Sequence, residues 1–385
     1  MTTILSVLPL LVCTFWSIVI FLDWITTPAK QRLWLFTFMV TAMFLYLGHA
    51  AFFFHFTEII PITDTLYCSC NLLVFPLFLR YLKGLCVPQY LHDPQQQRHD
   101  WPLLFIPSLL ITLLVGMFYL LMSDEESRGF IGIYLYHNQF TALTGYAFWQ
   151  AVFHHGGKLI FALQVVAVAI CGWKDLRSYH RLVDDTYADT DDKKMRKMQV
   201  ILTLLITGAI LGFVSNLIGR WRFDGHPLLL WMPSLFFSIL LFMIGYAGSR
   251  QQFSVCDLEQ DTDEMEKPSV QEDSPQPNSS LAVKLEQLMN GEQLYLRHDL
   301  KIGEVATLLN TNRTYIQRAI GELSNQSFTQ YINRKRIEHA TRLMREHPEY
   351  NMDTISTQSG YTHLGTFYRN YKIFTGKTPA KGLTD

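Results

Sequence analysis

Four polar residues in the C-terminal quarter of the chain have the types and the spacing of a surface that reads DNA bases. They are Arg313, Thr314, Gln317 and Arg318. On a helix these positions share one face. Arginine can bond guanine through two hydrogen bonds, and glutamine can bond adenine in the same way. The pattern therefore predicts a helix that enters the major groove of double-stranded DNA.

A second polar group lies inside an apolar stretch of the chain. His154, His155 and Lys158 are spaced i, i+1 and i+4, so His154 and Lys158 share a helical face. An ionisable residue within a membrane span is a functional hypothesis by default. We expect these three residues to line an outward-facing pocket for an anionic or metal ligand, or else to face lipid headgroups and water as interfacial side chains.

Further candidate ligands lie near the outer ends of the same predicted membrane region, at His49, His55, Cys68 and Cys70. They are scattered over separate predicted helices, so we predict no metal site and no cofactor. The six cysteines of the chain form no C-x-x-C pair, which argues against a zinc finger and against a disulfide scaffold. Walker, H-E-x-x-H, G-x-S-x-G and kinase motifs are absent from the sequence, so we predict that the protein is not an enzyme.

The positions of these residues follow from an uneven composition. The chain has 385 residues, of which 49% are hydrophobic and 17% charged, with a net charge of −1. Long apolar runs fill residues 1–249, whereas residues 250–385 have the composition of a soluble protein. This division excludes an ordinary cytosolic globule.

Seven apolar stretches approach the length of about 20 residues that a membrane-spanning helix needs. They lie near 3–22, 33–54, 64–83, 101–122, 148–171, 199–219 and 226–248. The third stretch is the least regular, because polar residues at 68–71 interrupt it. We predict an all-α protein whose first domain, residues 1–249, is a seven-helix transmembrane bundle.

The arginines and lysines of the loops predict the orientation, because cytoplasmic loops accumulate them. With the N-terminus outside, the inner loops and the segment after the last span hold 13 of these residues and the outer loops hold 3. We therefore expect a multi-pass protein of the bacterial inner membrane with a cytoplasmic C-terminal domain.

An acidic linker is predicted at 250–280. Residues 251–280 contain eight acidic residues and one lysine, together with three prolines. Such a segment cannot bury enough apolar surface to order itself. It would tether a soluble domain, 281–385, in which 14 basic residues outnumber 10 acidic ones. That excess of positive charge suggests a polyanionic partner.

The apolar positions of 281–385 predict two helix-turn-helix units joined by a long helix over 328–346. Asn312 is the expected N-cap of the first recognition helix, and Thr362 that of the second. Gly360 occupies a turn that requires positive φ. The inward face of the first recognition helix is predicted to carry Ile316, Ala319, Ile320 and Leu323.

Residues 285–381 resemble the DNA-binding domain of the AraC/XylS family of bacterial transcription regulators, and the segment from Gly360 to Pro379 is close to that family's signature. The seven-helix half resembles no family that we can name. The resemblance implies two recognition helices that read successive major grooves, with a third set of residues contacting phosphates. The implied base-reading residues of the first unit are Arg313, Thr314, Gln317 and Arg318. Those of the second are Leu364, Gly365, Thr366, Tyr368 and Arg369. The expected phosphate contacts are Arg334, Lys335, Arg336, Lys372 and Lys377.

Leu364 and Gly365 stand where the family usually has polar residues, so the second helix is expected to rely on Thr366, Arg369 and phosphate contacts. The whole predicts a one-component, membrane-embedded regulator that responds to an unknown small-molecule or lipid signal. We expect an activator, but the sequence does not distinguish activation from repression. Its expected partners are DNA, the bilayer, RNA polymerase and a second copy of itself in a homodimer. A transporter or membrane enzyme with a regulatory tail, a passive membrane anchor and proteolytic release of the tail remain alternatives.

Overall fold

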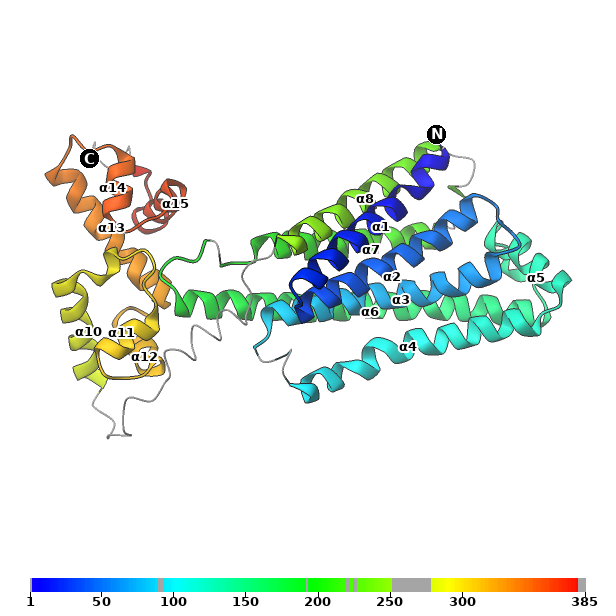
Figure 1. The fold of residues 1–385 in the computed structure, drawn as a ribbon, viewed down its shortest axis with the longest axis horizontal. Helices are drawn as coiled ribbons and strands as arrows, with labels where there is room; N and C mark the ends of the chain where they lie inside the picture. Colours follow the sequence, from blue (N-terminus) through cyan, green and yellow to red (C-terminus); the bar gives the residue numbers. More distant parts are fainter. Residues whose placement is uncertain are drawn as a thin grey trace. The chain divides into compact units, whose positions relative to one another are not determined.

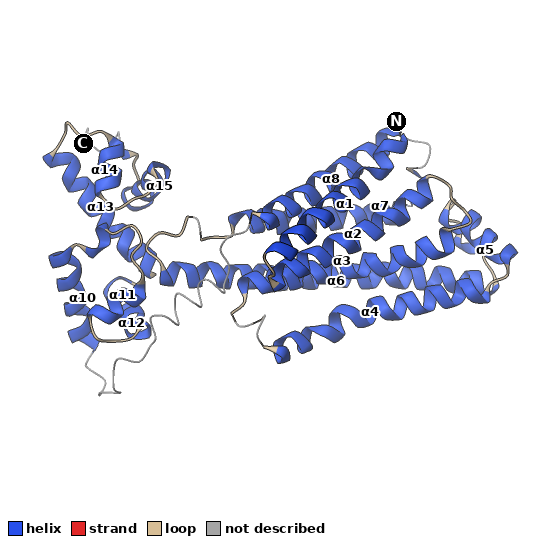
Figure 2. Ribbon diagram, in the orientation of Figure 1, coloured by secondary structure: helices blue, strands red, loops and turns tan. Residues whose placement is uncertain are grey.

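The computed structural model describes residues 2–88, 90, 93–191, 193–218, 222–223, 227–250 and 278–379. Within these ranges all of the regular elements are helices, joined by short loops and turns, as predicted (Figure 2). The acidic linker predicted at 250–280 falls mostly outside the described residues, which resume at Asn278.

The chain divides into two compact units. The N-terminal unit comprises Met1–Leu176 and Met195–Gln252, and the C-terminal unit comprises Arg177–Lys194 and Phe253–Asp385. Residues 177–194, which follow the fifth apolar stretch, thus group with the soluble domain. The sequence boundaries at 249 and 281 do not anticipate this grouping.

Helices fill the N-terminal unit, and the long ones run roughly alongside one another (Figure 1). Its elements are α1 (Thr2–Thr26), α2 (Lys30–Phe53), α3 (Ile60–Cys86), α4 (Pro94–Leu121), α5 (Asp124–Phe130), η1 (Ile131–Leu135), η2 (Phe140–Ala142), α6 (Gly145–Thr186), α7 (Arg196–Ile218) and α8 (Pro227–Ser249). Each of the seven predicted stretches coincides with most of one helix: α1, α2, α3, α4, α6, α7 or α8.

Six helices in the described part of the chain are long and apolar enough to cross a membrane. The apolar part of α4 is shorter, Phe105–Leu121. The irregular third stretch became α3, and 67% of its most apolar window is buried, the largest share among the six. Among the polar residues at 68–71, Cys70 is buried and the other three are half-buried.

The close packing of α2 against α3 depends on Gly48. A Cβ atom at this position would lie 2.9 Å from both the carbonyl oxygen of Thr63 and the Cβ of Tyr67. Small residues such as glycine let two helix backbones approach this closely. Such residues are enriched between helices in membranes, where association depends on close packing rather than on a hydrophobic force.

The C-terminal unit contains α10 (Asn278–Glu292), η4 (Leu294–Leu296), α11 (Ile302–Leu308), α12 (Arg313–Ser324), α13 (Phe328–Glu346), α14 (Met352–Gln358) and α15 (Leu364–Thr375). The long helix α13 has the predicted bounds, and a capping box at Ser327 and Gln330 fixes its start. Its N-terminal half contributes Phe328 and Ile332 to one buried cluster, and its C-terminal half contributes Ile337 and Met344 to another. This arrangement gives two helix-turn-helix units on one shared helix, as predicted.

Two local predictions in this unit are wrong. The N-cap of α15 is His363 rather than Thr362, because the Thr362 hydroxyl donates instead to Oδ2 of Asp189, 3.0 Å away. Leu323, expected to face inward, is 41% exposed. It lies in the last turn of α12, where Asn325 takes a left-handed conformation and ends the helix.

Candidate nucleic-acid interface and a polar cluster in the N-terminal unit

The first recognition helix is α12, and its orientation follows from one cap and one apolar face. The Asn312 side chain accepts a hydrogen bond from the backbone nitrogen of Tyr315 at 3.1 Å, as predicted for the N-cap. Ile316, Ala319 and Ile320 are buried. Among the predicted base-reading residues, Thr314 and Arg318 are exposed, whereas Arg313 and Gln317 are half-buried. The helix therefore offers a polar face at its N-terminal half, the part that enters the groove in helix-turn-helix proteins.

The second recognition helix is α15, which buries Phe367 and Tyr371. The five predicted contact residues all lie in its first two turns: Leu364, Gly365 and Arg369 are exposed, and Thr366 and Tyr368 are half-buried. The exposed pair Leu364 and Gly365 adds no hydrogen-bonding side chain. The polar side chains among the five predicted contact residues are Thr366, Tyr368 and Arg369.

The predicted phosphate contacts divide into accessible and engaged residues. Arg334 is exposed and pairs with Glu338 at 3.1 Å, one turn along α13. The Lys335 side chain is 16% exposed and pairs with Glu286 at 2.7 Å. Lys372 and Lys377 are exposed. Arg334, Lys372 and Lys377 are thus accessible to solvent, and their contact with phosphate stays a prediction.

Arg336 does not. Its side chain is buried, with 1% of the residue exposed. The Nε atom donates to the carbonyl oxygen of Tyr295 and Nη2 donates to that of Arg297, both at 2.6 Å. The guanidinium also lies 5.4 Å from the ring centroid of Tyr361. Burial lowers the pKa of Arg336 from its usual value. The guanidinium contacts both helix-turn-helix units, and its burial keeps it from reaching a phosphate. The prediction that Arg336 contacts a phosphate is therefore wrong.

An acidic segment of the C-terminal unit lies against α15. Asp191 accepts a hydrogen bond from Arg369 Nη2 at 2.5 Å, and its other carboxylate oxygen accepts one from the Thr366 hydroxyl. Asp189 receives the hydrogen bond from Thr362. Two of the residues predicted to read DNA are therefore occupied by a carboxylate of the same chain.

The backbone of this segment is anchored in the domain. Thr329 donates to the carbonyl oxygens of Asp184 and Tyr187, at 2.8 and 2.5 Å. The backbone nitrogen of Ala188 donates to the carbonyl oxygen of Leu300 at 3.0 Å, and Ala188 belongs to the first core cluster. Residues 184–191 are thus packed into the C-terminal unit and hydrogen-bonded to it.

Sequence reasoning missed this contact, although a signal was present. Residues 184–192 contain five aspartates in an otherwise basic loop. Five like charges beside a basic domain indicate an electrostatic partner, but which partner depends on the fold.

In the N-terminal unit, the three predicted pocket residues do not all line one cavity: His154 and Lys158 share one, and His155 lies outside it. His154 is 7% exposed, and its Nε2 lies 2.7 Å from Oδ2 of Asp64. His155 Nδ1 instead lies 2.8 Å from the carbonyl oxygen of Ala151 and 3.1 Å from the Tyr134 hydroxyl. A cavity of about 60 Å³ is lined by His154 and Lys158 together with Cys68 and Asn138. The predicted pairing of His154 with Lys158 is thus present around one cavity. Asp64, which sequence reasoning overlooked, is the buried acid of the group.

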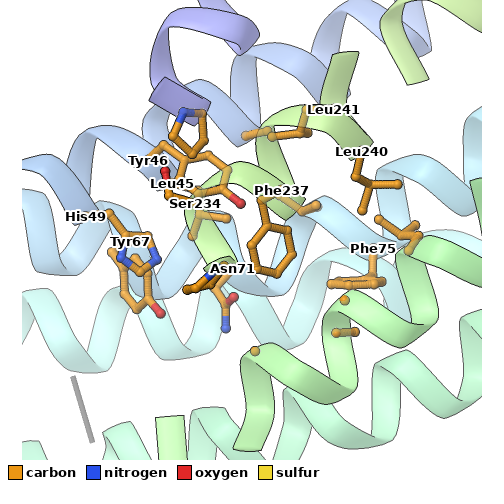
Figure 3. Close-up of a pocket in the computed structure, with 18 of the residues that line it drawn as sticks. Leu45, Tyr46, His49, Tyr67, Asn71, Phe75, Ser234, Phe237, Leu240 and Leu241 are labelled. Carbon is orange, nitrogen blue, oxygen red and sulfur yellow. The ribbon is translucent and has the colours of Figure 1, made fainter. Parts of the chain in front are cut away.

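Of the other candidate ligands, Cys70 is buried and His55 stacks on Tyr136 with 4.9 Å between ring centroids. His49 lines a second cavity of about 160 Å³. Figure 3 shows His49 and Tyr67 toward one side of this cavity, Asn71 and Phe237 near its middle, and Phe75 and Leu240 toward the other side. Its lining is mostly aromatic and aliphatic, which suits an apolar ligand.

Comparisons with known proteins match the C-terminal unit. A family model described as a helix-turn-helix domain matches residues 305–383. An uncharacterized HTH-type transcriptional regulator of Staphylococcus aureus (strain MRSA252) is 26% identical over 96 residues, which are 25% of this chain and 13% of the relative. The Msm operon regulatory protein of Streptococcus mutans is 28% identical over 82 residues, 21% of this chain and 29% of the relative. No solved structure matches the chain.

The chain therefore carries an AraC-type helix-turn-helix domain at its C-terminus and is similar there to transcriptional regulators. This supports transcription regulation and DNA as a partner. The matched segment spans less than a third of each of these relatives.

Proposed function

We propose that the protein is a one-component transcription regulator of the bacterial inner membrane, with its C-terminal unit in the cytoplasm. Six long apolar helices support membrane embedding, and the loop distribution of arginine and lysine supports the orientation. The DNA-binding residues would be those exposed on α12 and α15, together with Arg334, Lys372 and Lys377. RNA polymerase and a second copy of the chain are proposed as further partners.

One observation carries the regulatory part of this proposal. Residues 177–194 comprise the last turns of the apolar helix α6 and the segment before the apolar helix α7, yet they form one compact unit with the DNA-binding domain. The same segment supplies Asp191 to Thr366 and Arg369. A passive anchor needs no such contact, because a flexible tether alone would hold the domain at the membrane.

The contact implies two states with different affinities for DNA. In the present state the Asp191 carboxylate takes the place that a phosphate or a base edge would take on α15. DNA can bind the second unit fully only after this segment has moved. A signal that favours the moved state in the N-terminal unit would raise promoter occupancy, because a ligand shifts an equilibrium by its differential affinity for the two states.

The first test compares the full chain in lipid nanodiscs with a fragment comprising residues 278–385. Operators found by chromatin immunoprecipitation of the full-length protein would serve as the DNA. We expect the fragment, which lacks the acidic segment, to bind about 10-fold tighter, since a charge-assisted hydrogen bond contributes about 1.5–3 kcal/mol. Equal affinities would remove the competition from the proposal.

The second test separates a sensor from a passive anchor. Residues 250–385 would be fused to an unrelated single membrane helix and expressed with an operator-driven reporter. The proposal expects reporter output that no longer responds to the inducing condition. Retained response in the fusion would identify the N-terminal unit as an anchor only.

A further inference from the structure

Three side chains of different chemistry converge inside the N-terminal unit. Asp64 and Cys68 are one turn apart on α3, and His154 projects from α6. One ligand-type atom from each residue lies within 4.8 Å of the other two. Aspartate, cysteine and histidine are all residue types that ligate zinc in proteins.

The histidine is held in the form that a metal requires. Its Nδ1 lies 2.8 Å from the carbonyl oxygen of Gln150. A carbonyl oxygen only accepts, so Nδ1 carries the hydrogen and Nε2 points toward Asp64. Metal-binding histidines are commonly oriented by such a hydrogen bond from the other ring nitrogen.

The carboxylate is oriented as well. The Tyr119 hydroxyl donates to Oδ2 of Asp64 at 2.9 Å, and Asp64 is 5% exposed. The short distance of 2.7 Å between Asp64 Oδ2 and His154 Nε2 places one proton between them. A cation binding at this point would take the place of that proton.

Charge favours a divalent ion here. A carboxylate and a thiolate together carry two negative charges, and neutral imidazole carries none, so a divalent cation makes the site neutral. Neutrality matters because an unpaired charge within a membrane span is costly. Thiolate and imidazole ligands favour zinc-class ions over magnesium or calcium.

The spacing also suits such an ion. Bonds of about 2.0–2.3 Å in a tetrahedral site separate the ligand atoms by roughly 3.3–3.8 Å. This range lies between the 2.7 Å of the closest pair and the 4.8 Å limit of the group. The cavity of about 60 Å³ that Cys68 and His154 line leaves room for a water molecule in the fourth position.

We propose that Asp64, Cys68 and His154 bind a divalent transition-metal ion of the zinc class, with the fourth position open to the adjoining cavity. Binding releases the proton shared by Asp64 and His154 and the proton of the Cys68 thiol. The site fixes α3 to α6, the helix whose last turns, from residue 177 to 186, belong to the C-terminal unit. The role of the metal ion as a regulatory signal rests on the proposed function, whereas metal binding itself does not.

Binding is tested on the purified full chain in nanodiscs, stripped with a chelator and titrated with Zn²⁺ and with Co²⁺ as a spectroscopic probe. We expect one equivalent of Co²⁺ to produce a thiolate-to-metal charge-transfer band, which excess Zn²⁺ removes. Absence of stoichiometric binding, or binding without the thiolate band, would overturn the site.

Variants locate the site. Cys68→Ser and His154→Gln should each weaken Zn²⁺ binding at least 10-fold. The matched controls are Cys70→Ser and His155→Gln, neighbouring residues of the same types outside the cluster, and these should bind as the unaltered chain does. Equal loss in variants and controls, with all four eluting as folded monodisperse protein, would refute the assignment.

A separate readout distinguishes this proposal from the proposed function. Operator affinity is measured for the full chain with and without Zn²⁺. A change that Cys68→Ser abolishes supports both the metal site and its role as a signal. Stoichiometric binding with unchanged operator affinity leaves the metal site standing and overturns its role as a signal.

Discussion

Asp191 and Arg369 form an ion pair, with 2.5 Å between Oδ1 and Nη2. The arginine belongs to the recognition helix α15, and the aspartate belongs to the segment that follows α6. A carboxylate and a phosphate present similar negatively charged oxygens to an arginine. Under the proposed function, DNA and residues 184–191 would therefore compete for one guanidinium.

Asp191→Asn should raise the operator affinity of the full chain several-fold, because the amide loses the charge attraction but keeps the size of the side chain. The 278–385 fragment, which lacks Asp191, should bind the operator at least as tightly as the Asp191→Asn chain. Fluorescence anisotropy with labelled operator measures both. Glu349→Gln, an exposed acid paired with His347, is the control and should leave affinity unchanged. An unaltered affinity in Asp191→Asn would show that the pair does not oppose DNA.

Arg318 and Arg334 should fail in different ways. Arg318 is exposed on the recognition face of α12, so Arg318→Ala is expected to cost about 1–3 kcal/mol and to relax the preference at one base pair. Arg334 is exposed on α13, so Arg334→Ala should weaken specific and random DNA alike and lower the salt slope by about one. Titrations at several salt concentrations separate these outcomes. Equal losses on operator and random DNA for both variants would contradict the assignment.

Arg336 should behave as a structural residue. Arg336→Ala leaves the carbonyl oxygens of Tyr295 and Arg297 without their donor, so it is expected to destabilise the C-terminal unit by about 3 kcal/mol or more. Chemical denaturation of the 278–385 fragment measures this loss. Arg342→Ala, at an exposed position of the same helix, should change stability by less than about 0.5 kcal/mol. A folded Arg336→Ala variant with normal stability and a reduced salt slope would restore the phosphate role.

Periodicity predicted most of the fold because helices leave a regular apolar pattern. The bounds of α13 and the buried positions Ile316 and Phe367 follow from the spacing of apolar residues alone. Asn312 was predictable as a cap because the capping interaction is local, three residues along the chain. Elements of this kind need no knowledge of distant contacts.

The failures involve long-range contacts. Arg336 looks like its neighbours Arg334 and Lys335 in sequence, and only the positions of two carbonyl oxygens about 40 residues earlier make it structural. Thr362 does not cap α15, because its hydroxyl donates a hydrogen bond to Asp189, which is far away in the chain. Asp64 was hidden for the same reason, since its partners His154 and Tyr119 lie on other helices.

Acid should weaken the first helix-turn-helix unit through Glu286. Burial by itself raises the pKa of Glu286, but hydrogen bonds from Lys335 and Tyr331 outweigh it and lower the pKa below its usual value. A lowered pKa gives stability that is complete above about pH 4.5, the unfolded value, and is lost as the pH falls through the folded value. Thermal melting of the 278–385 fragment from pH 7 to pH 3 should show this loss.

Two variants identify the group responsible. Glu286→Gln and Lys335→Met each remove one partner of the 2.7 Å ion pair, so both should be less stable than the unaltered fragment at pH 7 and should lose less stability on acidification. A full acid response in Glu286→Gln would assign the titration to another carboxylate.

Gly360 and Gly321 should respond in opposite ways to the same substitution. Gly360 has φ of +82°, and a Cβ there would lie 2.5 Å from the carbonyl oxygen of Leu296. Gly360→Ala must therefore strain the turn and displace backbone, at a cost of about 2 kcal/mol or more. Gly321 lies within α12, and a Cβ there meets no atom within 4 Å. Gly321→Ala should stabilise the fragment by about 0.5–1 kcal/mol, because alanine loses less conformational entropy in a helix. Denaturant unfolding of both variants measures the difference, and a neutral Gly360→Ala would show that the turn between α14 and α15 can relax without its glycine.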